Sequence, residues 1–215
     1  MAAKKQTVAM PTGRQAAYSA RNRAALIRAG QEVLAEIGPS ATIEQLAAHA
    51  EVSPTTIYKY FENKDRLFIE ALGEMWHAWV PWAFAQTSTT DHLEAAITVC
   101  RRLFRVKQTH PQFADVLHNT IKQLPDFFIR ADEETAKGVL ARLASTGQIA
   151  GDDFENRFKL WSSMFLGLMA HVHVTEDLSA EEADDAIGIA LSVWGITPAK
   201  AKKIISRDLG LTLIK

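Results

Sequence analysis

Residues 42–61 read Thr-Ile-Glu-Gln-Leu-Ala-Ala-His-Ala-Glu-Val-Ser-Pro-Thr-Thr-Ile-Tyr-Lys-Tyr-Phe, and they predict two short helices joined by a tight turn. Thr42 is expected to cap the first helix, with Gln45 at the reciprocal position of a capping box. Ser53 is expected to cap the second, with Pro54 in its first turn, where a missing backbone N–H costs nothing. The pair is typical of a helix-turn-helix unit.

The apolar residues of this stretch predict which side of each helix is buried. The inward set is Ile43, Leu46, Ala47, Ala50, Val52, Ile57 and Phe61. The outward set of the second helix is Pro54, Thr55, Thr56, Tyr58 and Lys59, which mixes hydroxyls, a phenol and an ammonium. Such a flank suits the DNA major groove, because threonine and lysine can address base edges. The alternative is an αα-hairpin with a merely solvated outer face.

Other residues near this unit suit the phosphate backbone. Thr42, Tyr58 and Tyr60 are candidates for phosphate oxygens, and Lys64 is expected in the first turn of a following helix. The charge pattern agrees: the net charge of the whole chain is -1, yet every formal charge in residues 1–30 is positive. We expect residues 1–18 to form a flexible basic arm that adds contacts to DNA.

Helical periodicity continues along the remainder of the 215 residues, and we find no convincing strand pattern. The predicted fold class is therefore all-α. We expect a helix-turn-helix domain at 19–65, a connecting helix at 66–82 with a bend at Pro81, just beyond a regular helix over 64–80, and a larger helical domain at 83–215. The predicted helices of this last domain are 92–109, 111–123, 125–145, 154–174 and 181–194.

Residues 27–72 resemble the N-terminal domain of the TetR family of bacterial transcription regulators. The resemblance is carried by Ala-Gly-Gln-Glu-Val-Leu-Ala-Glu-Ile-Gly at 29–38, Thr-Ile-Glu-Gln-Leu-Ala at 42–47 and Val-Ser-Pro-Thr-Thr-Ile-Tyr-Lys-Tyr-Phe-Glu-Asn-Lys-Asp-Arg-Leu at 52–67. It places the base-reading helix on 53–60 and phosphate contacts on Thr42, Tyr58, Tyr60 and Lys64. One departure is Glu51, which stands where the family usually has glycine and is expected to need a left-handed backbone.

The resemblance also implies a C-terminal effector pocket and a homodimer that binds a palindromic operator, with the protein acting as a repressor. The aromatic composition of residues 76–169 favours a small apolar or aromatic effector. The candidate pocket residues are Trp79, Trp82, Phe104, Phe128, Trp161 and Phe165. The candidate dimer faces are Phe158, Trp161, Ser162, Phe165, Leu166, Met169 and Ala170, followed by Ala186, Ile187, Ile189, Ala190, Val193 and Trp194, with packing inside the chain as the alternative.

The sequence gives no support for an enzyme, a cofactor or a metal site. His171 and His173 are two residues apart and do not share a helix face, which disfavours metal binding. Cys100 is the single cysteine, so an intrachain disulfide is excluded, and we expect a buried, unreactive thiol in a cytoplasmic protein. We find no apolar run of the length of a membrane span. The alternative function is a helical adaptor protein that does not bind DNA.

Overall fold

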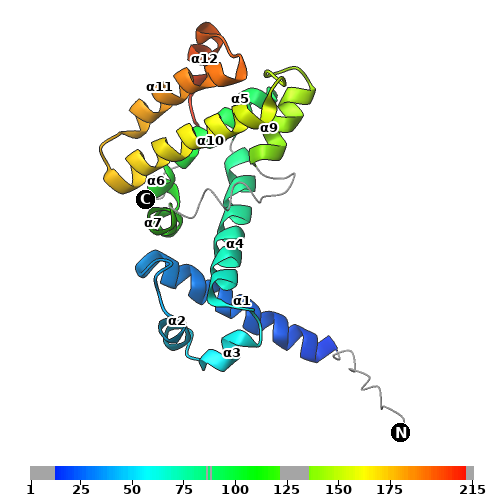
Figure 1. The fold of residues 1–215 in the computed structure, drawn as a ribbon, viewed down its shortest axis with the longest axis vertical. Coiled ribbons are helices and arrows are strands. Elements are labelled where there is room, and N and C mark those ends of the chain that lie inside the picture. The colour runs from blue at the N-terminus through cyan, green and yellow to red at the C-terminus, as the bar shows by residue number, and fades with distance from the viewer. Residues whose placement is uncertain (1–12, 86, 88, 122–135, 212–215) are drawn as a thin grey trace.

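The computed structural model describes residues 13–85, 87, 89–121 and 136–211. Within these ranges every regular element is a helix, so the predicted all-α fold is confirmed. Figure 1 shows two bodies: α1, α2 and α3 form a small group at one end, and α5 to α12 form a larger group at the other. The long helix α4 runs from the small group into the large one.

The small N-terminal group consists of α1 (Gly13–Glu36), α2 (Ile43–His49) and α3 (Pro54–Tyr58), packed on the first turns of α4 (Lys64–Ala85). Its core is apolar and nearly closed to solvent. It contains Leu26, Ile27, Val33, Leu34, Leu46, Ile57, Phe61 and Leu67. Gly30 of α1 is needed for this packing, because a Cβ there would lie 2.3 Å from a methyl carbon of Leu67.

Helix α1 starts earlier than the sequence predicted. It begins at Gly13, so residues 13–18 belong to the helix and not to a flexible arm that ends at Tyr18. The physical reason lies in the composition of 14–17, Arg-Gln-Ala-Ala, which consists of good helix formers. Residues 1–12 of the predicted arm lie outside the described residues.

Helix α4 corrects a second prediction, because it continues through Pro81 to Ala85. Proline removes one backbone N–H, so the carbonyl of His77, four residues earlier, loses its partner in the helix. His77 and Pro81 are both exposed, which leaves that carbonyl on the solvent side of the helix, where water can satisfy it. The connecting helix therefore enters the large body without a break at Pro81.

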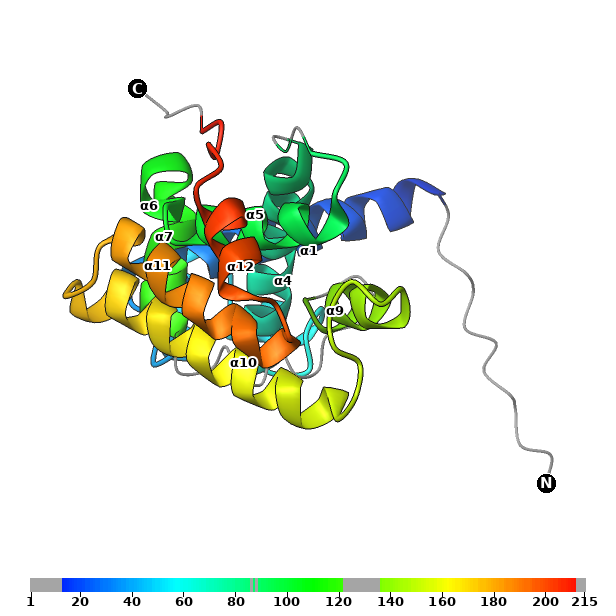
Figure 2. The ribbon, with the colours of Figure 1, turned by 90° about the horizontal axis from the view of Figure 1, so that it is seen from above.

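The large C-terminal body contains α5 (His92–Leu103), α6 (Val106–Thr109), α7 (Pro111–Thr120), α9 (Ala136–Ser145), α10 (Phe154–Ala170), α11 (Ala180–Ala190) and α12 (Pro198–Ile205). The predicted helix at 92–109 is thus divided into α5 and α6. A π-helical turn (His171–Thr175) extends α10, and a 3₁₀ turn (Leu191–Trp194) extends α11. Figure 2 shows α10 and α11 side by side, with α12 beside α11.

Buried arginines of α5 and of the link between α5 and α6 fix the C-terminal helices to the core. Arg101 and Arg105 both approach the buried carboxylate of Asp184 on α11, at 3.1 and 2.8 Å. Arg102 donates hydrogen bonds to the carbonyl oxygens of Ala83 and Leu209. Burial, followed by the positive charge of Arg101, lowers the pKa of the Arg102 guanidinium. Residues 206–211, which follow α12, therefore pack on the body.

Candidate DNA-binding surface and effector cavity

The turn between α2 and α3 is built on Glu51. Its φ is +53°, so the left-handed backbone expected at this position is confirmed. The N–H of Val52 donates to the carbonyl of Ala47 (2.9 Å), and that of Glu51 donates to Ala48 (3.2 Å). These two bonds form a Schellman motif, which closes a helix and reverses the chain. The Glu51 side chain is exposed, as expected.

Helix α3 presents its polar flank to solvent. Thr55 and Lys59 are exposed, and Tyr58 keeps 55% of its surface exposed, whereas Ile57 is fully buried on the opposite side. Ser53 caps the helix by accepting from the N–H of Thr56 at 3.2 Å. The helix is shorter than the predicted range 53–60, since it ends at Tyr58 and continues as hydrogen-bonded turns. The geometry is that of a short, rigid reading helix with an accessible outer face.

The candidate phosphate-binding residues are held by neighbouring elements. Thr42 caps α2 in the expected capping box with Gln45. The hydroxyl oxygen of Tyr60 accepts a hydrogen bond from Asn22 of α1 (3.2 Å). The ammonium of Lys64 donates to the carbonyls of Pro39 (3.0 Å) and Ala41 (2.8 Å). An ammonium has three donors, so one N–H of Lys64 remains for an anion while the other two fix its position.

Arg23, one of the basic residues near the N-terminus, has a role that the sequence did not predict. Its guanidinium forms an ion pair with Glu70 of α4 and lies 4.9 Å from the ring centroid of Phe61. Arg23 therefore connects α1 to α4 and to Phe61, at the end of the reading unit, by which we mean α2, α3 and the turn between them.

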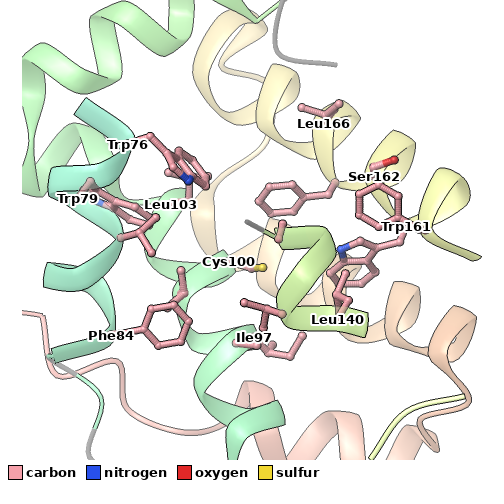
Figure 3. Close-up of a pocket in the computed structure, with 17 residues that line it drawn as sticks. Trp76, Trp79, Phe84, Ile97, Cys100, Leu103, Leu140, Trp161, Ser162 and Leu166 are labelled. Carbon is pink, nitrogen blue, oxygen red and sulfur yellow. The ribbon is translucent and has the colours of Figure 1, made fainter. Parts of the chain in front are cut away.

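A cavity of about 90 Å³ lies in the large body between α4, α5, α9 and α10 (Figure 3). Apolar and aromatic side chains dominate its walls, and none of the described lining residues carries a formal charge. The lining consists of Trp76, Trp79, Val80, Phe84, Ala96, Ile97, Val99, Cys100, Leu103, Ala136, Val139, Leu140, Phe158, Trp161, Ser162, Phe165 and Leu166. Burial raises the pKa of the Cys100 thiol to about 12, so the thiol stays protonated near neutral pH.

The structure places the candidate pocket residues in three groups. Trp79, Trp161 and Phe165 line the cavity. Trp82 and Phe104 are outside the described lining: Trp82 packs edge-on against His110 (4.5 Å between centroids), and Phe104 packs behind Phe165 (5.6 Å). Phe128 lies outside the described residues.

Sequence reasoning missed Trp76 and Phe84 as cavity residues, although a signal existed. Trp76, Val80 and Phe84 are spaced four residues apart, which puts them on one face of α4. Trp82 falls on a different face.

Helix α7 connects the large body to the N-terminal group, in addition to the continuous α4. The ring of Phe113 on α7 lies 6.3 Å from Trp76 and 6.1 Å from Trp79. At the other end of α7, Asn119 donates to the carbonyls of Leu34 (3.1 Å) and Ala35 (2.8 Å) in the last turn of α1. Helix α7 therefore contacts both the aromatic wall of the cavity and the end of α1.

The two C-terminal histidines are held by separate partners. The ring of His173 is buried, and its Nε2 donates to the carbonyl of Leu103 at 2.9 Å, while burial lowers its pKa. His171 is exposed and pairs with Asp177 at 2.9 Å. Among the described residues no group of three or more candidate ligands is arranged to hold a metal ion. Within the same part of the chain, no helix is long and apolar enough to cross a membrane.

Comparison with known proteins agrees with this geometry. Residues 26–71 match the family described as bacterial regulatory proteins, tetR family. Comparison with curated proteins gives no match. Among solved structures, the chain is similar to RolR in complex with resorcinol, at 18% identity and a TM-score of 0.68, over 90% of this chain and 97% of that one.

Two repressors have similar folds at lower scores. SmeT, the repressor of the Stenotrophomonas maltophilia multidrug efflux pump SmeDEF, matches at 16% identity and a TM-score of 0.59, over 83% of this chain and 95% of that one. Thermus thermophilus FadR in complex with lauroyl-CoA matches at 16% identity and a TM-score of 0.59, over 81% and 96%. The fold and its exposed reading helix define an all-α, helix-turn-helix transcription regulator that binds DNA. Residues 26–71 carry the DNA-binding domain of the tetR family.

Proposed function

We propose that this regulator is a homodimeric repressor that binds a palindromic operator and is released by a small apolar or aromatic effector. The observation that carries the proposal is the course of α4. It begins at Lys64 beside the reading unit and lines the effector cavity with Trp76, Trp79 and Phe84. A molecule in the cavity therefore contacts the same rigid helix that supports the DNA-facing helices.

The DNA contacts that we propose divide by chemistry. Thr55, Thr56 and Lys59, together with Ser53 and Pro54, would address base edges in the major groove. Thr42, Tyr58, Tyr60 and Lys64 would contact phosphates, which fix register without reading sequence.

A dimer is supported by the outer face of α10 and α11. Leu160 is 53% exposed and Ile189 is 74% exposed, and Ser163 and Gly167 lie on the same outer side of α10 as Leu160. The face that the sequence favoured is largely occupied within the chain, since Trp161, Phe165 and Ile187 are buried in its own core. The proposed interface is thus the exposed side of these helices. It keeps Ile189 from the predicted set and adds Leu160, and Ser163 and Gly167 allow close approach there.

Release by the effector requires that DNA and effector favour different positions of α4. If the two positions of α4 bind DNA and effector with different affinities, binding of one ligand weakens binding of the other. The two contacts of α7, on the cavity wall and on the end of α1, give the reading unit a second support that also depends on the cavity. The similar protein RolR was solved with resorcinol, a single-ring compound, and SmeT and FadR are repressors, which supports both the effector class and the direction of control.

Substitutions test which residues contact phosphates and which contact base edges. On duplexes selected from a random pool, Lys64→Ala should weaken binding to all sequences alike and reduce the salt dependence by about 0.9 in the log–log slope, as expected for one lost phosphate contact. Lys59→Ala should instead change which sequence is preferred. Lys202→Ala on α12, at the far end of the molecule in Figure 1, is the matched control and should change neither. Unchanged DNA binding in Lys64→Ala and Lys59→Ala would favour the adaptor alternative.

A further inference from the structure

The walls of the cavity define the chemistry of the molecule that it accepts. Its described lining is aromatic or aliphatic apart from the Ser162 hydroxyl, the neutral Cys100 thiol and indole N–H groups. Ser162 donates to the carbonyl of Lys159 in its own helix (3.0 Å), so its donor is already used. In Figure 3 its oxygen points away from the cavity. The remaining donors are therefore those of the indoles and the thiol.

Trp79, Trp161 and Trp194 differ in whether protein atoms enclose the indole N–H. The Nε1 atoms of Trp79 and Trp194 are enclosed by protein and lack a hydrogen-bond partner. Trp161 is 4% exposed and is not among these enclosed atoms. In Figure 3 its indole nitrogen lies on the edge of the ring turned toward Leu140 and Cys100, across the cavity. Among the described lining residues, Trp161 therefore carries an indole N–H that is not enclosed and that faces the cavity, so a bound molecule can reach it.

The volume of the cavity and the absence of charge among its described lining residues limit the size and the charge of the molecule that it can bind. A cavity of about 150 Å³ holds benzene. The volume here is about 90 Å³, so one ring is the upper limit and side chains must shift to admit it. Burying an ion without a partner is costly, and the described lining offers no countercharge. The raised pKa of the Cys100 thiol, caused by burial, reports the same penalty on negative charge at this place.

We propose that the cavity selects an uncharged compound of about one aromatic ring that carries an oxygen acceptor, and that Trp161 Nε1 donates a hydrogen bond to that oxygen. This inference rests on the proposed function of the cavity as the effector site. It makes Trp161 a specificity-determining residue. Because Trp161 belongs to α10 and the facing wall belongs to α4, such a molecule bridges the helix of the proposed dimer interface and the helix that carries the reading unit.

Anisole and ethylbenzene test the hydrogen bond, because they have nearly the same shape and differ in an ether oxygen against a methylene group. In calorimetric titrations of the full chain, anisole should bind about fivefold more tightly than ethylbenzene, the effect of one net hydrogen bond. Trp161→Phe should abolish this preference and still bind ethylbenzene, which shows that the cavity is intact. Trp79→Phe is the matched control, because it removes the same atoms from the same cavity. The N–H of Trp79 is enclosed by protein, so this variant should still bind anisole more tightly than ethylbenzene.

Equal affinity of the wild type for the two probes, or a preference that survives in Trp161→Phe, would overturn the inference. Benzoate tests neutrality: it should bind at least about tenfold more weakly than anisole, and equal binding would contradict the proposal. Absence of binding by every one-ring probe would also overturn it. Affinity for the selected DNA, measured on the same protein sample, separates these failures from a failure of the regulator function itself.

Discussion

Replacement of Glu51 by glycine should stabilise the protein, although it removes a side chain. Glu51 has a φ of +53° in the turn that joins α2 to the reading helix. A residue with a Cβ loses about 1–2 kcal/mol of folding free energy when its backbone is left-handed. Glycine avoids this strain, but it loses more conformational entropy on folding, which costs about 0.5–1 kcal/mol relative to alanine. The Glu51 side chain is exposed. The balance predicts a gain of about 1 kcal/mol and a rise in Tm of about 2–4 °C for a chain of this size.

Thermal and denaturant unfolding of two matched variants separates backbone strain from charge. Glu51→Ala removes the carboxylate and keeps the left-handed strain, so it should leave the free energy of unfolding within about 0.5 kcal/mol of the wild type. Glu44→Gly lies in the right-handed helix α2, where glycine should cost about 1 kcal/mol. If Glu51→Gly destabilised the protein as Glu44→Gly does, the explanation of this turn would be wrong.

Three further predictions concern two contacts inside the large body and one between that body and α1. Asp184→Ala should lower the free energy of unfolding by about 3–5 kcal/mol, because two buried arginines lose their shared carboxylate. Asp185→Ala changes an exposed neighbour and should lower it by less than about 0.5 kcal/mol. Similar losses in both variants would refute the role of Asp184 as the shared partner of the arginines. Burial lowers the pKa of His173, so the unfolded chain takes up the proton first as the pH falls below about 6.5. Stability should therefore fall between pH 7.5 and 5.5, and His173→Gln, unlike the exposed His77→Gln, should flatten that decline in a Tm series. Asn119→Ala removes two bonds to the end of α1 and should cost about 1 kcal/mol in chemical unfolding; no loss would remove α7 as a support of the reading unit.

The N-terminal body was largely predictable from the sequence, because its signals are local. The Thr42 and Ser53 caps, the buried face of α2 and the left-handed backbone at Glu51 each follow from residues within a few positions of one another. The start of α1 was placed too late, at residue 19, although Gly13 opens the helix.

The C-terminal body was less predictable, because its organisation depends on contacts between distant segments. An aromatic residue in a helix gives the same sequence pattern whether it faces the core, a cavity or a partner. Trp161 was assigned to both a pocket and a dimer face, and only the packing of α4 and α5 against α10 places it on the cavity. The bonds from Arg102 to the carbonyl of Leu209 join residues more than a hundred positions apart, and no local pattern indicates them.

Selection of bound duplexes from a random DNA pool, followed by sequencing, tests the central claim most directly. The exposed flank of α3, displayed twice by a two-fold dimer, predicts a palindrome whose half-sites are separated by about one helical turn of DNA or a multiple of it. Failure to retain any duplex at low ionic strength, or a selected site without symmetry, would contradict the account.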